Sequence, residues 1–440
     1  MSVSKTHCTA LIVAGGSAAL VLGGCMNGPN VEPGTASSRA VMPAGNSGAI
    51  VHSAARRFDP FNVALAGDDD GALSMQHGGA SERIPLTPSP VEYAHQPVLS
   101  ASEILGEVLA SEKPASDLVR NVGANFSQIT FSLEGANFDP NISPDGRKMV
   151  FASTRHSFTA DIFIKDVSSR VKTQLTNTDA HDMMPKISPD GTRVAFASNR
   201  RGNWDIYIMP ITGGKAVQIT TESSHELHPS WSPDGQHLVF SRLGAVSGRW
   251  ELWVANVFNT GMAHYLGDGL FPEWCPIAGT GQNGADQIVF QRSSRRGDRA
   301  FSIWTIDYAD GQASYLTEIV GSEVAACINP TWSPDGERVA FAAVPNPKQW
   351  AEMTKTRPSS ANLWMISTNG SGLVNLTSND VINLMPVWSS DNRIYFVSDR
   401  GGVDNIWTLR ADQAVLAASG GAPAGDDGAV ITSAPSDDDG

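Results

Sequence analysis

The sequence is short of positive charge and of hydrolase signatures, and each shortage excludes a class of function. Lys and Arg number 31 against 45 Asp and Glu, which gives a formal net charge of −14. No basic stripe occurs, so the sequence excludes nucleic acid as a partner. No Gly-x-Ser-x-Gly occurs either, and the region after the last repeat described below, residues 412–440, is too short for an α/β-hydrolase domain. A serine peptidase built on such a domain is therefore excluded.

Long apolar runs are also missing. The most apolar stretch, Thr9 to Gly24, is too short and too rich in glycine to span a membrane well. It follows a polar start and precedes Cys25, which is typical of an export signal. Leu22-Gly-Gly-Cys25 resembles the lipobox of bacterial lipoproteins, which implies removal of residues 1–24 and a lipid anchor on Cys25. An ordinary secretory signal with a chance cysteine is the alternative, and the protein is exported in both cases.

Cysteine is scarce, with four in the chain. Cys8 is lost with the signal peptide, and Cys25 is the expected site of lipidation. Cys275 and Cys327 remain in an oxidising compartment. They are candidates for a disulfide between neighbouring repeats, and two free buried thiols are the alternative, because geometry decides between them. Met26 follows Cys25 where inner-membrane lipoproteins commonly carry aspartate, and this resemblance points to the outer membrane.

The two ends of the chain lack the apolar periodicity of a packed core. Residues 25–127 are rich in Gly, Ser, Ala and Pro, and we expect a flexible tether with a short amphipathic helix near residues 100–111. Residues 412–440 are small, acidic and of low complexity, which predicts a disordered tail. Residues 128–411 are left as the folded domain.

The folded region is organised around a recurring turn, Ser-Pro-Asp-Gly. Copies start at Ser143, Ser188, Ser232 and Ser333, and a degenerate copy occupies residues 389–392. Proline presets φ, aspartate suits the next position and glycine takes the left-handed position that follows. This chemistry predicts a tight turn between two antiparallel strands. The first three copies start 45 and 44 residues apart, and a period of this size with four strands predicts propeller blades.

Two further markers recur after each turn and define six units. One is an apolar residue followed by an aromatic, as in Asp205-Ile-Tyr207, and the other closes the unit, as in Gln218-Ile-Thr220. The sixth unit lacks the closing marker, but a copy, Gln128-Ile-Thr130, precedes the first unit. We therefore predict an all-β fold, a six-bladed β-propeller closed by this N-terminal strand, which lies beside Ile406 in the last blade.

These repeats resemble a known family. Phe196-Ala-Ser-Asn-Arg-Arg-Gly-Asn-Trp-Asp-Ile-Tyr207 is followed by Gly213-Gly-Lys-Ala-Val-Gln-Ile-Thr220, and together they are similar to a blade of the TolB-type propeller, a PD40 or WD40-like repeat. The resemblance covers about residues 128–410 and implies an envelope protein that binds a partner at one propeller face. Such blades also occur in prolyl-oligopeptidase-type enzymes and in many exported proteins. Where TolB carries an α/β domain before its propeller, this chain has the low-complexity tether.

Histidines just before two innermost strands are candidate metal ligands. His181 and His225 are aligned, each four residues before the blade proline, and His228 lies nearby in sequence. Neighbouring blades would place these side chains at one mouth of the central channel, where they could bind a metal or an anion. The alternative is that they are solvated side chains on the channel rim, and then no cofactor is expected.

Tryptophan and arginine recur at fixed places in the repeats. Trp231, Trp274, Trp332 and Trp388 share a register, which predicts packing between blades. Trp204, Trp250 and Trp350 lie off that register and are candidates for a binding surface, Trp350 being in an insertion of about residues 344–360. Arg155, Arg200 and Arg400 are predicted to pair across a hairpin with Asp161, Asp205 and Asp404.

Together these features predict a monomeric, lipid-anchored envelope protein at the outer membrane, facing the periplasm. Its propeller would bind an envelope protein, a peptide or a glycan on one face without catalysing a reaction. A Tol–Pal-type component of envelope integrity is one alternative. A metal-dependent enzyme similar to polysaccharide lyases is the other, and it requires the histidine site.

Overall fold

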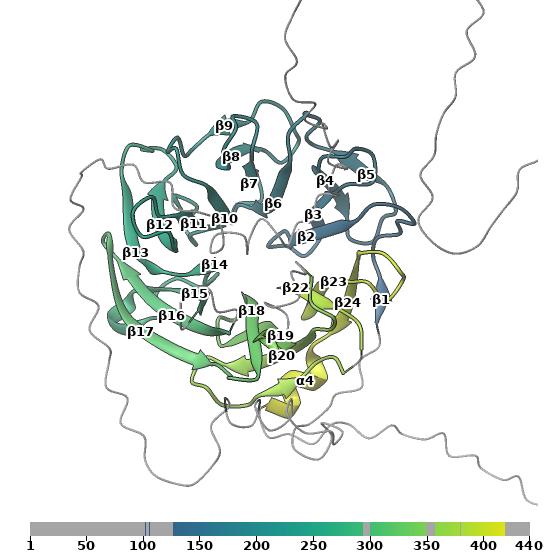
Figure 1. Ribbon diagram of the computed structural model, residues 1–440, viewed down its shortest axis with the longest axis vertical. Helices are drawn as coiled ribbons and strands as arrows, with labels where there is room; N and C mark the ends of the chain where they lie inside the picture. The colour runs from purple at the N-terminus through teal and green to yellow at the C-terminus, as the bar shows by residue number, and fades with distance from the viewer. Residues whose placement is uncertain are drawn as a thin grey trace, which may run out of the picture. The chain divides into compact units, whose positions relative to one another are not determined.

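The structure is a computed structural model, and it describes Ser102, Leu105 and residues 126–293, 300–348, 357–378 and 380–418. Cys25 and Trp350 lie outside the described residues. Six four-stranded antiparallel sheets surround a common centre, with the innermost strands β2, β6, β10, β14, β18 and β22 facing it (Figure 1). The predicted six-bladed propeller is confirmed.

Each blade is a meander that runs outward from the channel. Blade 1 comprises β2 (Asn137–Ile142), β3 (Lys148–Ser153), β4 (Asp161–Asp166) and β5 (Lys172–Gln174). Blade 2 comprises β6 (Asp182–Ile187), β7 (Arg193–Ser198), β8 (Asp205–Pro210) and β9 (Val217–Gln218). Blade 3 comprises β10 (Glu226–Trp231), β11 (His237–Leu243), β12 (Trp250–Asn256) and β13 (Ala263–Asp268).

The other three blades follow the same order. Blade 4 comprises β14 (Leu270–Trp274), β15 (Asp286–Ser293), β16 (Phe301–Ala309) and β17 (Gln312–Val320), with a short 3-10 helix, η3 (Gln282–Gly284), before β15. Blade 5 comprises β18 (Ala325–Trp332), β19 (Arg338–Pro345), β20 (Asn362–Ser367) and β21 (Val374–Asn375). Blade 6 comprises β22 (Asn383–Trp388), β23 (Arg393–Ser398), β24 (Asn405–Arg410) and, as its outer strand, β1 (Ser127–Gln128).

The ring closes as the sequence predicts. β1 pairs antiparallel with β24, Gln128 facing Trp407, and the Ile129 N–H donates to the Ile406 carbonyl at 2.9 Å. Asn405 ties the closing segment down, because its Oδ1 accepts from the Ser132 N–H at 2.9 Å and from Asn137 Nδ2 at 3.0 Å. The first and last described parts of the chain therefore share one sheet, which leaves the sixth blade with no missing strand.

The Ser-Pro-Asp-Gly turns are fixed by their own side chains. In each of the four copies the serine hydroxyl lies 2.5 Å from the aspartate Oδ1 and accepts the N–H of the residue that opens the next strand. The turn glycines have φ of 66° to 73°, a left-handed conformation that a side chain would strain. The conformation of the turn is therefore fixed by the residues of the turn itself and does not depend on the rest of the blade.

The second and third markers meet through one hydrogen bond. The threonine that closes the blade accepts the N–H of the apolar residue in the third strand, at 2.8 or 2.9 Å in four blades: Thr176 with Ile162, Thr220 with Ile206, Thr377 with Leu363 and Thr130 with Ile406. The two markers recur together because each fourth strand is short and needs this side-chain bond to hold its edge.

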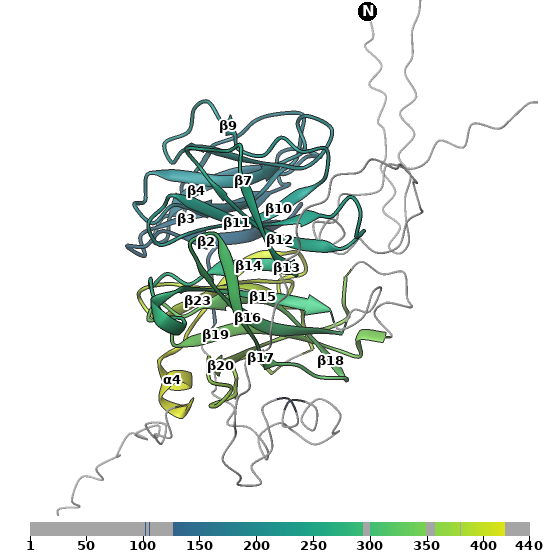
Figure 2. The same ribbon diagram turned by 90° about the vertical axis from the view of Figure 1, so that its left-hand side faces the viewer.

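One prediction about the ends of the chain needs correction. Residues 412–418 are not a disordered tail but form α4 (Asp412–Ala418), because Ala414 is buried and the helix packs beside β20 and β21 (Figures 1 and 2). At the other end Leu105 is fully buried against the core between blades 4 and 5. Ser102 and Leu105 are helical, and the rest of the predicted helix near residues 100–111 lies outside the described residues. In the described part of the chain, no helix is both long enough and apolar enough to cross a membrane.

Candidate binding site in the central channel

A residue–proline pair at the same place in all six innermost strands builds the wall of the central channel. The residue before proline has a left-handed backbone with φ between 49° and 55° in every blade: Asp139, Met184, His228, Phe271, Asn329 and Met385. Strand pairing shifts register at each of these positions. A bulge re-aims the side chain, and a left-handed conformation before proline is uncommon for residues other than glycine. All six residues line one cavity that is open at its mouth.

One wall of the cavity carries an ion pair. Lys186 Nζ contacts Glu273 Oε1, and the second Glu273 oxygen accepts from the Ser230 hydroxyl at 3.2 Å. The backbones on which these side chains stand are also joined, because Trp231 Nε1 donates to the Lys186 carbonyl and Trp332 Nε1 to the Glu273 carbonyl, both at 2.9 Å. The predicted packing of these tryptophans between blades is confirmed, and their N–H groups fix the blades on either side of the pair.

His228 is the most unusual side chain of the cavity. It is 5% exposed, its ring lies 3.7 Å from the Phe271 ring, and neither ring nitrogen has a hydrogen-bond partner among the described residues. Burial, followed by the positive charge of Lys186, lowers the pKa of His228 to about 3. The ring is therefore neutral at physiological pH and presents one donor and one acceptor to the cavity.

Asn329 and Gln291 leave further polar atoms unused. The Asn329 N–H donates to Gln291 Oε1 at 2.8 Å, while Asn329 Oδ1 and Gln291 Nε2 are buried without a partner among the described residues. Across the channel Asp139 accepts the Met184 N–H at 3.1 Å. Burial raises the pKa of Asp139 to about 6, although this hydrogen bond and Lys186 oppose the rise. The cavity thus combines apolar walls with a neutral imidazole, an amide, an ion pair and the Asp139 carboxyl group.

The predicted three-histidine metal site is not formed. His181 Nδ1 accepts the Ala160 N–H at 3.1 Å, and His225 Nδ1 accepts the Trp204 N–H at 3.2 Å, so each ring joins two neighbouring blades. His228, in contrast, lies inside the channel. In the described ranges no three His, Cys, Asp or Glu side chains are grouped so as to hold a metal ion. The prediction was wrong because equivalent places in two repeats lie at two different blade junctions. The His181 and His225 rings therefore do not meet around one point.

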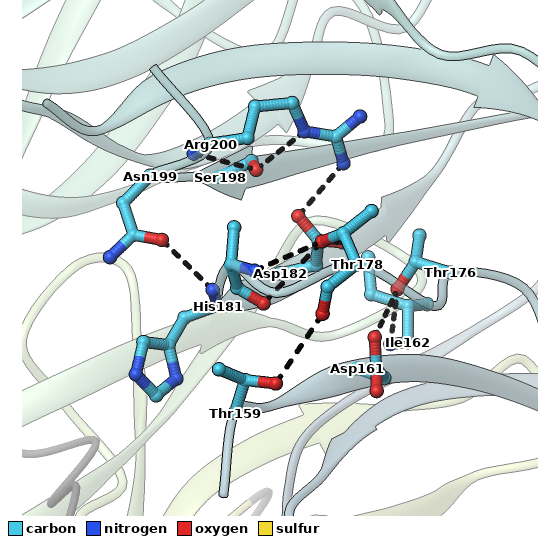
Figure 3. A network of polar contacts seen from close by, with 11 residues as sticks. Thr159, Asp161, Ile162, Thr176, Thr178, His181, Asp182, Ser198, Asn199 and Arg200 are labelled. Carbon is cyan, nitrogen blue, oxygen red and sulfur yellow. Dashed lines mark hydrogen bonds and ion pairs between the residues drawn. The ribbon is translucent and has the colours of Figure 1, made fainter. Parts of the chain in front are cut away.

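The surroundings of His181 show the repeated junction in detail (Figure 3). The Arg200 guanidinium donates to Asp182 Oδ1 at 2.9 Å, Asn199 Oδ1 accepts the His181 N–H, and the imidazole points away from this ion pair. The pairing predicted for the arginines was therefore wrong. Arg200 pairs with Asp182, the first residue of its own blade, and Arg400 donates to Asn383, the first residue of blade 6. Asp404 pairs instead with Arg357 of the blade 5 insertion.

The predicted tryptophan surface is not exposed. Trp204 and Trp250 are 8% and 7% exposed and belong to the main apolar core. Their carbonyl groups accept the first N–H of the next blade, from Glu226 at 2.8 Å and Gly269 at 2.9 Å. The prediction was wrong because the position before the third strand faces the neighbouring blade, and the tryptophan fills that junction.

The two remaining cysteines are free and buried. Cys275 follows the end of β14, whereas Cys327 lies near the start of β18, six repeat positions away along parallel inner strands. At roughly 3.3 Å per residue this offset exceeds the reach of a disulfide. The disulfide prediction was therefore wrong, and the alternative of two buried thiols holds. Burial also raises the pKa of both thiols, which keeps them in the unreactive protonated form.

Residues 109–312 match the family model described as the TolB beta propeller domain. Over these residues, the propeller resembles the TolB type. The solved structures similar to it include a TolB candidate from Agrobacterium tumefaciens, with 20% identity, 64% of this chain and 96% of that chain covered, and a TM-score of 0.47. TolB from Acinetobacter baumannii is 19% identical, with a TM-score of 0.46, and the match covers 59% of this chain and 58% of that one. An oligogalacturonate lyase from Vibrio parahaemolyticus is 14% identical, with a TM-score of 0.43 and coverage of 66% and 97%.

The sequence did not predict the six left-handed residues around the channel of this TolB-like propeller. It also did not predict the polar atoms there that have no partner among the described residues. The prolines were visible in the sequence, since each innermost strand contains one. The residue before each proline was the available signal, because five kinds of side chain at one repeat position indicate a wall with its own chemistry.

Proposed function

We propose that this TolB-like propeller is a non-catalytic binding protein of the cell envelope whose central channel receives part of a partner. The observation that carries the proposal is the set of buried polar atoms on His228 and Asn329, which line the cavity and have no partner among the described residues. A buried polar atom without a hydrogen bond costs about 1–3 kcal/mol. A ligand that supplies those bonds would recover that free energy on binding.

The chemistry of the cavity favours an uncharged polar ligand with an apolar part. Lys186 and Glu273 neutralise each other, and His228 is neutral. Phe271, Met184 and Met385 supply apolar contact surface. A peptide segment with its amide groups fits this wall, and so does the hydroxylated, partly apolar face of a glycan.

Site-specific photo-crosslinking in intact cells tests the proposal. A photoreactive amino acid at Met385 lies in the channel wall, and the same substitution at Met262, a methionine that is 63% exposed, is the matched control. We expect a discrete crosslinked product from position 385 that is absent at 262 and is lost with His228→Asn, a change chosen because asparagine tolerates the left-handed backbone. Protease or glycosidase digestion of the product separates a protein partner from a glycan. Identical products from both positions would refute a channel ligand.

The family match favours one specific partner system as a second candidate. A TolB-like propeller in the envelope suggests a Tol–Pal-type role. Co-purification with a peptidoglycan-associated lipoprotein, abolished by His228→Asn, would support this role. Its absence under conditions in which the position 385 crosslink forms would reject it while leaving channel binding intact.

We also propose that the protein is anchored by lipid on Cys25 at the outer membrane, as the lipobox-like sequence suggests. Metabolic labelling with palmitate, compared between the native chain and Cys25→Ser, tests this part independently of the channel. Label on the native chain and none on the variant is expected, whereas no label on either would reject the anchor.

A further inference from the structure

Blade 1 carries an exposed group of apolar and cationic side chains beside the ring closure. We call it the seam patch: Phe131, Leu133, Arg155, His156, Phe158, Arg170, Val171 and Lys172. Phe158 is fully exposed and Leu133 is 93% exposed. The two loops that carry them are in contact, because the Ala136 N–H donates to Thr154 Oγ1 and the Thr154 N–H to the Ala136 carbonyl, both at 3.0 Å.

The cations of the seam patch stand close together. Lys172 lies 5.2 Å from the centroid of the Phe163 ring. The His156 ring lies 5.8 Å from the same centroid, and burial, followed by Lys172 and Arg155, lowers the pKa of His156 and favours its neutral form. The Arg170 guanidinium lies 5.4 Å from the Phe131 ring. Burial, and after it the positive charges of Arg155 and Lys165, lowers the pKa of Lys172. These groups repel one another in a chain whose formal net charge is −14.

The same cations lack carboxylate partners. Arg155, Arg170 and Lys172 form no ion pair with any residue in the described ranges, whereas Arg200, Arg242 and Arg357 each do. The repeat explains why. Blades 2 and 3 begin with Asp182 and Glu226, which hold Arg200 and Arg242, but blade 1 begins with Asn137.

Asn137 is committed to the ring closure. Its Nδ2 donates to Ser132 Oγ at 2.8 Å and to Asn405 Oδ1 at 3.0 Å. Because the ring closure uses an asparagine at this place, blade 1 has no carboxylate there to neutralise Arg155. The Arg155 side chain is exposed at the surface. Glu134 is the carboxylate in the loop that also carries Leu133.

We propose that the seam patch is a docking surface for an anionic lipid membrane. The Phe158 and Leu133 side chains are 100% and 93% exposed, so they suit insertion among lipid headgroups better than a fit into a preformed protein pocket. The surrounding cations match the negative charge of acidic headgroups, which attract clustered Lys and Arg at a membrane surface. The proposal is independent of the channel, and it does not require a lipid on Cys25.

Vesicle binding tests this surface. The full chain with Cys25→Ser, which cannot be lipidated there, is sedimented with vesicles of phosphatidylcholine alone or mixed with phosphatidylglycerol. We expect stronger binding to the mixed vesicles, and the double variant Arg155→Gln/Lys172→Gln should reduce it by about five-fold for each cation removed. The double variant Leu133→Ser/Phe158→Ser should also reduce it, whereas Phe258→Ser/Met262→Ser, a matched exposed apolar pair on blade 3, should not.

A second measurement reports insertion directly and does not depend on affinity. An environment-sensitive fluorophore on Phe158→Cys, in a background with Cys8→Ser and Cys25→Ser, should shift its emission to the blue on phosphatidylglycerol vesicles. The same fluorophore on Phe258→Cys should not shift. Equal binding to both kinds of vesicle, or seam-patch variants that bind like the blade 3 control, would overturn the proposal. Salt-sensitive binding of polyglutamate to the patch without vesicle binding would overturn it in favour of an acidic protein.

Discussion

Single residues before proline decide what the channel can bind. Asp139 and His228 occupy equivalent places in two blades, with φ of 49° and 54°. The backbone is the same, yet one residue supplies a carboxyl group and the other an imidazole. Burial raises the pKa of Asp139 and lowers the pKa of His228, and both shifts favour the uncharged form. A repeated backbone device therefore gives a wall of different functional groups at constant geometry.

Asp139→Asn should make the protein more stable at neutral pH. The folded state raises the pKa of Asp139 from 3.8 to about 6, so the folded chain binds the proton more tightly than the unfolded chain. Stability from this group is complete below about pH 4 and is lost as the pH rises toward 6. The variant should match the native chain at pH 4 and exceed it by on the order of 1–3 kcal/mol at pH 7.5, measured by urea unfolding.

Asp190→Asn is the control of opposite sign. A hydrogen bond from Ser188 lowers the pKa of Asp190, so its contribution is present above about pH 4 and is lost as the pH falls. This variant should be less stable than the native chain at pH 7.5. An Asp139→Asn variant that is no more stable at pH 7.5 would show that burial does not raise the pKa of this carboxyl group.

At the scale of elements, segments outside the blades are docked by a few buried apolar side chains. Leu105 inserts into the core between blades 4 and 5, beside Val320 and Cys327. The Ser102 hydroxyl accepts the Gly321 N–H at 3.0 Å on the loop between those blades. Among the described residues, Leu105 and Ser102 make these contacts, and at the other end of the chain the buried Ala414 lies in α4.

Leu105→Ala should loosen this segment without unfolding the propeller. Truncation of a buried leucine costs about 2–5 kcal/mol, most of which would be lost from docking. The Gly321 amide, which depends on Ser102 for its partner, should then exchange with solvent hydrogen faster, as it should in Ser102→Ala. Leu133→Ala, at an exposed position, should leave that rate unchanged. Unchanged exchange at Gly321 in Leu105→Ala would contradict the docking.

At the scale of the molecule, the ring is held at its seam by the same side-chain contact that holds the fourth strand in blades 1, 2 and 5. Thr130 accepts the Ile406 N–H at 2.8 Å, just as Thr377 accepts the Leu363 N–H at 2.8 Å in blade 5. The difference is connectivity, because Thr130 and Ile406 are joined only through the whole ring. Loss of the seam contact therefore frees an entire edge of blade 6.

Thr130→Val and Thr377→Val form a matched pair for the seam. Each leaves a buried N–H unpaired and should cost about 1–3 kcal/mol. In Thr130→Val, hydrogen exchange should rise at Ile129, Ile406 and Asn137, because the closing strand detaches at one end. In Thr377→Val the rise should stay within blade 5. Equal, local effects of the two changes would show that the seam is no weaker than a continuous blade.

The repeats made the propeller predictable, but they did not predict the site in the channel. Ser-Pro-Asp-Gly fixes its own turn through Ser188, Asp190 and a left-handed glycine, so local chemistry alone reveals it. His181, His225, Trp204 and Trp250 looked like free functional groups because their partners come from the next blade. No pattern within one repeat shows whether a side chain faces solvent or the neighbouring repeat.

The sequence by itself determined the number of blades, the turns and the strand that closes the ring, because each depends on hydrogen bonds between neighbours in the chain or on a repeated period. The tertiary structure alone decided which polar atoms remain without partners in the channel and which cations remain unpaired on blade 1. Those outcomes depend on contacts between blades, where one residue such as Asn137 can take the place of a carboxylate and change what its neighbour binds.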